Sequence, residues 1–305
     1  MGVFSKMVSL QLMLFTLIAV GIALKKLGFI DGKGRRLLSD LLIHVILPCN
    51  IIHSFTGGVR PSGAFMRNCL LMLLLSSAIQ VLVYLLNRPL FRRFPEHQRR
   101  VLCYGMICSN STFVGLPVAE ALFGDLGVMY TAMFQIPLRF TMWTAGLSLF
   151  TSVSKKDAFR KLVRHPCIVA VFLGLALMCL PLNPVPGFVM DSVAALNRCT
   201  TPVSMLVIGS ILADAPLKSL FSPSVLYYSA LRLLAFPLLV WGLMLPLPMD
   251  GLLKSICLLM TAMPAGSTTS ILADRYGCDA AFAAQLVFVS TLLSIATIPL
   301  LTLLV

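Results

Sequence analysis

Residues 108–117 read CSNSTFVGLP and residues 260–270 read MTAMPAGSTTS, and these two stretches are the strongest indication of the fold. Each one interrupts a long apolar segment with proline, glycine and a group of hydroxyl or amide side chains. A bilayer has no water to satisfy backbone groups that leave a helix, so such interruptions persist only where protein or a wet cavity supplies partners. One interrupted segment in each half of a chain is the pattern that indicates a transporter's binding site near the bilayer midplane.

The composition is that of a membrane protein. Of the 305 residues, 58% are apolar and 11% are charged, and the mean hydropathy is +0.95, values far outside the range of soluble domains. The apolar runs are continuous rather than alternating, which favours α-helices over a β-barrel. No polar stretch is longer than a loop, so we expect one membrane domain and no soluble domain.

The apolar runs predict ten membrane-spanning helices. Their ranges are 7–25, 36–56, 68–88, 100–123, 127–151, 166–183, 188–213, 223–247, 251–274 and 280–304. The first run has no basic leader and no small-residue cleavage site, so it is interpreted as a retained helix rather than a signal peptide, with its N-terminus outside. Ten spans then place both termini outside.

The positive charges gather in three connecting segments and account for much of the net charge of +13. These clusters are Lys25, Lys26, Lys33, Arg35 and Arg36; Arg88, Arg92, Arg93, Arg99 and Arg100; and Lys155, Lys156, Arg160, Lys161 and Arg164. They follow spans one, three and five, so the positive-inside rule places all three in the cytoplasm. The charge is explained without nucleic acid, and we expect no nucleic-acid binding.

An odd number of helices in each half predicts an inverted repeat. The first five-helix repeat is expected at 1–152 and the second at 166–305, with a basic cytoplasmic connector at 153–165 between them. The predicted fold class is therefore an all-α polytopic membrane protein of ten transmembrane helices, built as two inverted five-helix repeats with broken crossing helices four and nine.

Four prolines support the correspondence between the two halves. Pro48 in span two has its counterpart in Pro202 in span seven, and Pro117 in span four has its counterpart in Pro264 in span nine. The two prolines of each half are separated by similar lengths of chain. The prolines are therefore expected to mark equivalent helix breaks.

The breaks in spans four and nine predict a binding site for an anion. Proline removes a helical hydrogen bond and glycine leaves helical geometry readily, so Gly115 and Pro117 interrupt span four, and Pro264 and Gly266 interrupt span nine. The half-helices direct N-terminal dipoles and free N–H groups towards a common centre, which suits a carboxylate. The polar side chains expected to bind it are Asn110, Ser111, Thr112, Ser267, Thr268 and Thr269. A proline-kinked helix whose hydroxyls bond their own backbone is the alternative, and two matched breaks favour the site.

Asn50 follows Pro48 in span two and has two interpretations. It either lines the same cavity or forms an interhelical hydrogen bond that holds the bundle together. The sequence leaves both open.

Three arginines fall within predicted spans, where charge is costly and a functional role is the default hypothesis. Arg139 lies near the middle of span five and is the best candidate to attract an anion; the alternative is snorkelling or pairing with a helix C-terminus. For Arg198 and Arg232 we favour snorkelling to an interface.

Acidic residues provide no obvious coupling site. The acids nearest to the membrane interior are Asp40 and Asp191, towards the ends of spans two and seven, and no buried carboxylate pair is evident. Coupling to H⁺ or Na⁺ is left open, and no cofactor is expected.

Nothing in the sequence indicates an enzyme. HExxH, GxSxG and paired intramembrane aspartates are absent from the sequence. The nine cysteines include no CxxC pair, so neither a metal site nor a disulfide framework is indicated.

Several motifs resemble those of the auxin efflux carrier family of permeases. The similar stretches are 110–117, 143–146, 201–213, 263–277 and 289–300, and together they cover both halves of the chain. The resemblance implies a ten-helix fold of two inverted repeats, related to bile acid–sodium symporters, with spans four and nine crossing at their prolines. Plant members of that family export auxin, an aromatic carboxylate, and bacterial members are often described as malate or malonate permeases.

Two departures limit what the resemblance implies. The connector at 153–165 is short, whereas many plant members have a long cytoplasmic loop, and this favours a compact bacterial-type permease. No asparagine follows Pro264 immediately, so the substrate contacts of plant members are not carried over in full.

The sequence therefore predicts a secondary transporter that moves a small organic anion, such as malate or malonate, across a bacterial inner membrane by alternating access. A channel with the same polar centre and a membrane-embedded ligand sensor are the alternatives. The expected partners are the anion and the lipid bilayer. The substrate, the direction of transport and the formation of a homodimer are left open.

Overall fold

The chain is mostly helical in the part that the computed structural model describes, which comprises residues 3–56, 62–150, 156, 160, 163–180, 185–213, 221–266 and 268–304. Those residues contain no β-strand, and a single isolated β-bridge joins Ser109 to Ala265. The prediction of an all-α protein is confirmed.

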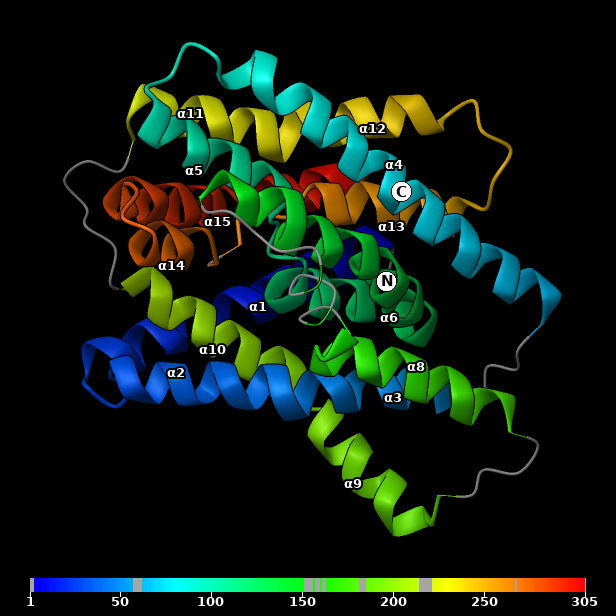
Figure 1. Cartoon of the computed structure of the whole chain (residues 1–305). Helices are drawn as coiled ribbons and strands as arrows, with labels where there is room; N and C mark the ends of the chain where they lie inside the picture. Colours follow the sequence, from blue (N-terminus) through cyan, green and yellow to red (C-terminus); the bar gives the residue numbers. More distant parts are fainter. Residues whose placement is uncertain are drawn as a thin grey trace. The chain divides into compact units, whose positions relative to one another are not determined.

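Helix occurs in each of the ten predicted apolar ranges (Figure 1). The elements in the first half are α1 (Val3–Lys26), α2 (Gly32–Leu41), η1 (Leu42–Ile46), α3 (Leu47–Thr56), α4 (Gly63–Phe91), α5 (Glu96–Ile107), η2 (Ser111–Gly115), α6 (Leu116–Thr141), η3 (Met142–Gly146) and η4 (Leu147–Leu149). Those in the second half are α8 (Pro166–Cys179), α9 (Gly187–Asn197), α10 (Thr200–Ala213), α11 (Pro223–Ala230), η6 (Leu231–Ala235), α12 (Phe236–Met244), α13 (Gly251–Thr261), α14 (Thr268–Arg275) and α15 (Ala280–Thr302).

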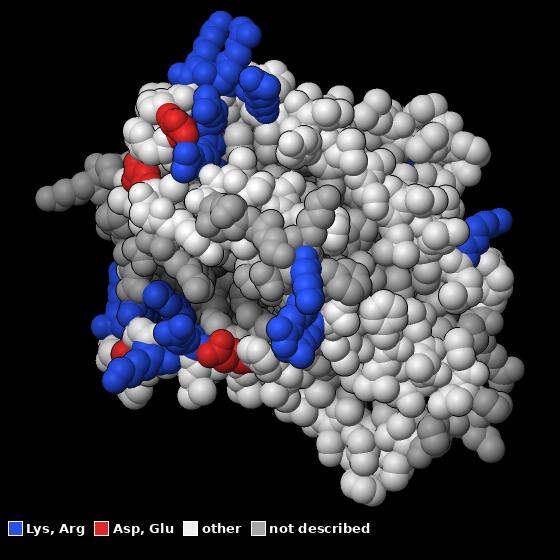
Figure 2. All heavy atoms as spheres, in the orientation of Figure 1, with Lys and Arg blue, Asp and Glu red and all other residues white. Residues whose placement is uncertain are grey.

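Five helical stretches in the described part are long and apolar enough to cross a membrane, and one of them, Ser111–Leu149, is kinked at Gly124, where the backbone is not helical. They are Gly32–Thr56, Gly63–Phe91, Ser111–Leu149, Pro223–Met244 and Ala280–Thr302. Large apolar side chains such as Leu70, Leu74 and Leu85 of α4 are exposed, as expected for a lipid-facing helix. Figure 2 shows the charged side chains of one face gathered in a few patches on a largely uncharged surface. A multi-pass membrane protein accounts for these features.

Proline shapes several of these helices. The wide helical turns η1, η2 and η6 end at Ile46, Gly115 and Ala235, each two residues before a proline. A proline ring clashes with the carbonyl four residues earlier and donates no hydrogen bond, and a wider turn accommodates both defects.

The predicted span at 188–213 is two helices rather than one, because α9 ends at Asn197 and α10 begins at Thr200. A continuous helix would bring the ring of Pro202 against the carbonyl of Arg198. The interruption moves Pro202 into the first turn of α10, where the missing N–H has no cost. Pro202 therefore lies directly after an interruption between two helices.

The described residues separate into two compact units, each assembled from three segments of the chain. The first unit comprises Met1–Leu71, Thr112–Met133 and Val163–Asp214, and the second comprises Met72–Ser111, Phe134–Leu162 and Ala215–Val305. Each unit contains residues from both predicted repeats. The predicted boundaries at 152 and 166 separate two repeats related by symmetry, whereas the two units are defined by which residues pack together. The repeat boundaries therefore stay a prediction.

In the first unit, α1 packs directly against α10 (Figure 1). The two backbones meet at Gly21 and Gly209: a Cβ on Gly209 would lie 2.2 Å from the carbonyl oxygen of Ile18, and one on Gly21 would lie 2.6 Å from that of Leu206. Small residues permit such close approach between membrane helices. Elsewhere in this unit α3 packs against α8 and α9.

In the second unit, α15 packs against α5, α11, α13 and α14. Its buried face includes Leu286, Val289 and Ser290. Tyr104 of α5 packs edge-on against Phe150, whose ring stacks on Tyr276. These contacts form the core that holds the two interrupted helices.

Replacement of Gly209 with alanine is expected to destabilise the first unit by about 1–3 kcal/mol, because the added methyl group would overlap the backbone of α1. Thermal unfolding of the detergent-purified protein measures the effect. Gly242→Ala is the matched control, since nothing lies within 4 Å of the Cβ it adds. Equal melting temperatures for the two variants would contradict the close contact between α1 and α10.

Candidate functional site

The two interrupted segments pair with each other within the second unit. Between α5 and η2, and again between α13 and α14, the chain leaves helical geometry, and Ser109 and Ala265 form an antiparallel bridge there. The amide of Asn110 donates to the carbonyl of Pro264, and the amide of Gly266 donates to the carbonyl of Cys108, each at 2.8 Å. The breaks predicted separately in spans four and nine thus form one structure.

This pairing satisfies backbone groups that the breaks release. The amide of Ala265 donates to the hydroxyl of Ser290 in α15 at 3.2 Å, while Pro264 has no amide hydrogen to satisfy. Gly266 is required by close approach, because a Cβ there would lie 2.8 Å from the sulfur of Cys108. Each break supplies partners that a bilayer does not offer.

Arg232 binds both breaks, which corrects the expectation that it snorkels to an interface. Its side chain is 3% exposed. Its Nε donates to the carbonyl of Met263 at 2.9 Å and its Nη1 to the carbonyl of Met106 at 2.8 Å. These carbonyls lie at the C-terminal ends of the two half-helices, where the helix dipole is negative and a cation is favourable.

The position of Arg232 explains why it was missed. Snorkelling is the usual choice for an arginine near a helix end because buried charge is costly. Here the two unsatisfied carbonyls provide the compensation, and they belong to segments distant in sequence. Pro237 is the local sequence signal that this part of span eight is unusual, and in the structure the wide turn η6 precedes it.

Arg139 connects to the first break through Gln135. The Arg139 side chain is 6% exposed, and its Nη2 donates to Oε1 of Gln135 at 3.0 Å. The Nε2 of Gln135 in turn donates to the carbonyl of Ser111 at 3.0 Å. Arg139 is therefore buried, and a single side chain, that of Gln135, connects it to the break. Gln135 is a positioning residue that the sequence did not reveal.

Several polar side chains at the pairing have unused hydrogen-bonding capacity. Among the described residues, the hydroxyls of Ser109, Ser111 and Thr269 are buried without a partner. Asn110 is buried, and Thr112 and Thr268 are half-buried; Ser267 lies outside the described residues. Buried hydroxyls without partners carry a free-energy cost that a bound ligand could remove.

The electrostatics of the pairing favour an anion. The helical turns η2 and α14 begin at Ser111 and Thr268, directly after the paired segments, and present N-terminal N–H groups. None of the described residues in 108–115 and 261–269 is acidic. Arg139 and Arg232 add positive charge, so no cation is needed to balance the site.

Asn50 forms its hydrogen bonds in the first unit, with partners from other elements. Its Nδ2 donates to Oε2 of Glu120 at 3.0 Å and to Oδ1 of Asn197 in α9. This is the interhelical hydrogen bonding that the sequence left as one of two alternatives.

Glu120 is an acid that the sequence reading overlooked. It lies within the predicted span 100–123, one turn after Pro117, and is half-buried, whereas Asp40 and Asp191 are exposed. Its hydrogen bond from Asn50 compensates the carboxylate. No local pattern marks it, because its partner lies 70 residues earlier in the chain.

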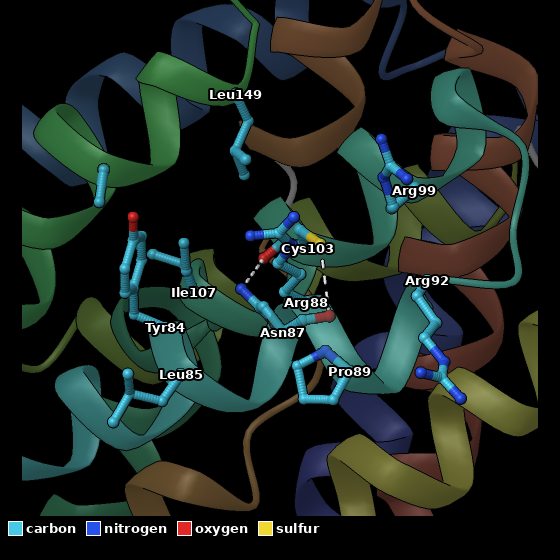
Figure 3. Close-up of a pocket in the computed structure, with 11 residues that line it drawn as sticks. Tyr84, Leu85, Asn87, Arg88, Pro89, Arg92, Arg99, Cys103, Ile107 and Leu149 are labelled. Atoms are coloured by element: carbon cyan, nitrogen blue, oxygen red, sulfur yellow. Dashed lines mark hydrogen bonds between the residues drawn. The ribbon is translucent and has the colours of Figure 1, made fainter.

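A basic cavity of about 950 Å³ lies elsewhere in the second unit, between α4, α5 and the end of span five (Figure 3). Arg88, Arg92 and Arg99 line it, and Asn87 in its wall donates to the carbonyl of Cys103 at 3.0 Å. The cavity extends to Ile107, the residue before the first break. Nearby, Arg100 bonds Glu96 and holds the pKa of that carboxyl below its usual value.

Comparisons with known proteins identify a transporter family. The model of the family described as membrane transport protein matches residues 6–302. An uncharacterized transporter of Methanocaldococcus jannaschii is 24% identical over 296 residues, covering 95% of this chain and 96% of the relative. One of Methanothermobacter thermautotrophicus is 26% identical over 297 residues, covering 95% of each. A Rhizobium meliloti protein named "Putative malonate transporter" is 24% identical over 199 residues, covering 62% of each.

Replacement of Arg232 with methionine is expected to destabilise the protein by roughly 2–5 kcal/mol, because two buried carbonyls lose their donors. The measurement is thermal unfolding in detergent. Arg198→Met serves as the control, since Arg198 is an exposed arginine at the end of α9. If both variants melt at the same temperature, Arg232 does not hold the breaks together.

Proposed function

Because the chain belongs to the membrane transport protein family, that of the auxin efflux carriers, we propose that it is a secondary transporter for a small organic anion. The observation that carries the proposal is the pairing of two helix breaks beside buried, unpartnered hydroxyls. A mono- or dicarboxylate of the malate or malonate class fits the positive potential and the hydroxyl donors. The Rhizobium meliloti relative is named for malonate, which supports this class.

In the proposed site the anion is bound by hydroxyl, amide and backbone N–H groups. Ser111 and Thr269 donate from their unused hydroxyls, and the buried Asn110 donates from its side-chain amide. Thr112, Ser267 and Thr268 complete the set predicted from the sequence. Arg139 contributes through its charge, with Gln135 holding it near Ser111.

The charge arrangement supports the proposed selectivity for an anion. Arg232 occupies the negative C-terminal ends of the half-helices, so their carbonyls are not available to coordinate a metal cation. The positive N-terminal ends are left for the substrate. The arginines of the basic cavity raise the local concentration of anions beside the first break.

The proposed mechanism is alternating access, in which one helical bundle rocks against the other around the site. It uses the predicted topology of ten spans in two inverted repeats, with both termini outside and the basic loops in the cytoplasm of a bacterial cell. A homodimer is compatible with this mechanism but not required by it.

Counterflow of labelled malonate and malate in proteoliposomes tests the function. We expect exchange that depends on unlabelled carboxylate inside the vesicles. No exchange of any mono- or dicarboxylate would refute the assignment, and single-channel conductance would indicate a channel instead.

Asn110→Ala is expected to raise the half-saturating concentration in counterflow about tenfold to a hundredfold, because a hydrogen bond to a charged group contributes about 1.5–3 kcal/mol. Asn68→Ala is a matched amide control in the first unit, where Asn68 bonds the hydroxyl of Tyr130. Both variants are checked for an unchanged melting temperature. Unchanged affinity in Asn110→Ala would remove Asn110 from the site.

A further inference from the structure

The first unit contains a chain of hydrogen-bonded polar side chains that the proposed anion site does not use. Glu120 accepts from Asn50, and Asn50 also donates to Oδ1 of Asn197. The Nδ2 of Asn197 lies 3.3 Å from Nδ1 of His53, and this nitrogen lies 4.0 Å from a carboxylate oxygen of Asp125. The chain runs from a half-buried carboxyl to two partly exposed titratable groups.

Within this series of hydrogen-bonded side chains, one acceptor, Oδ1 of Asn50, receives no hydrogen bond from the described residues. Asn50 is fully buried, and its Oδ1 has no hydrogen-bond partner among the described residues, although both N–H groups of the same amide are used. A buried carbonyl oxygen without a donor is unfavourable. The cluster therefore has a place for one more proton, next to the one carboxyl that Asn50 contacts.

We propose that Glu120 is a reversible proton-binding site, linked to His53 by the two amides. With Glu120 ionised, Asn50 donates to the carboxylate and Asn197 donates to an unprotonated Nδ1 of His53. When a proton from water binds Glu120, its O–H donates to Oδ1 of Asn50 after that amide turns over. Asn197 turns likewise and accepts from Nδ1 of His53, which gains a proton from water while Nε2 of the same ring releases one to water. The proton returns to water when the amides turn back.

The donor set suits a proton better than a metal cation. Calcium, magnesium and similar hard cations require several oxygen ligands, whereas here N–H groups already occupy oxygens of Glu120 and Asn197. The described residues hold no group of three or more His, Cys, Asp or Glu side chains suited to a metal ion. The charged groups that act on Glu120 are Asp125 and His53, while α9 contributes the neutral Asn197.

The position of Glu120 links this site to transport, and that part rests on the proposed function. Glu120 lies on α6, the helix that follows the first break, nine residues after Ser111 in the sequence. Its charge therefore changes on the same helix whose N-terminal end is assigned to the anion. Proton binding at Glu120 would couple anion movement to a proton gradient.

Infrared difference spectroscopy of the protein in lipid nanodiscs tests the proton site without any transport. Between about pH 8 and about pH 5 we expect the carbonyl stretch of a protonated carboxylic acid to appear. The band should be lost in Glu120→Gln and kept in Asp125→Asn. Glu120→Asp, which should keep a shifted band, replaces Glu120→Gln if the latter fails to fold. A band that persists unchanged in both Glu120 variants, or no band at all, would overturn the proposal.

Two further measurements distinguish a proton site from an alkali-cation site, and a proton site from one that is coupled to transport. If sodium chloride in place of choline chloride removes the band at constant pH, the site binds an alkali cation and the proton proposal is wrong. Counterflow is then measured across the same pH range, where Glu120→Gln should abolish the pH dependence of the wild-type protein. Failure of all counterflow together with a normal infrared titration would refute the transport function and leave the proton site intact.

Discussion

The structure depends on one constraint: backbone groups released inside a membrane must find partners within the protein. The bridge between Ser109 and Ala265 meets it by pairing the two breaks, so that each supplies donors and acceptors to the other. Ser290 and Arg232 complete the set from neighbouring helices. Each break therefore depends on the other for part of its hydrogen bonding.

The pairing also separates the charges of each interrupted helix, with its negative C-terminal end and its positive N-terminal end in different surroundings. Arg232 neutralises the carbonyls at the C-terminal ends, and Arg139 approaches the first break through Gln135. The N-terminal ends are left without a protein counter-ion among the described residues of the breaks, beside hydroxyls that have no partner. The same arrangement that stabilises the fold therefore leaves the positive N-terminal ends available to the carboxylate that we propose as substrate.

Local patterns predicted the helices and the breaks, whereas partners distant in sequence required the structure. The breaks are predictable from Pro117, Pro202 and Pro264, because a proline disrupts the hydrogen bonding of its own turn of helix. Arg232 and Glu120 look alike in sequence, as isolated charges in apolar runs, yet one bonds Met106 and Met263 and the other bonds Asn50. Their roles follow only from the packing of segments that are tens of residues apart. For this reason the sequence predicted the wrong position for Arg232 and did not indicate Glu120.

Hydrogen–deuterium exchange of the protein in nanodiscs, with and without malonate, tests most directly whether the two breaks form one anion site. The account predicts that malonate slows exchange in peptides covering both 108–117 and 260–270, to a similar extent, with no change in α1. Malonate binding that protects only one of the two peptides, or neither, would contradict it.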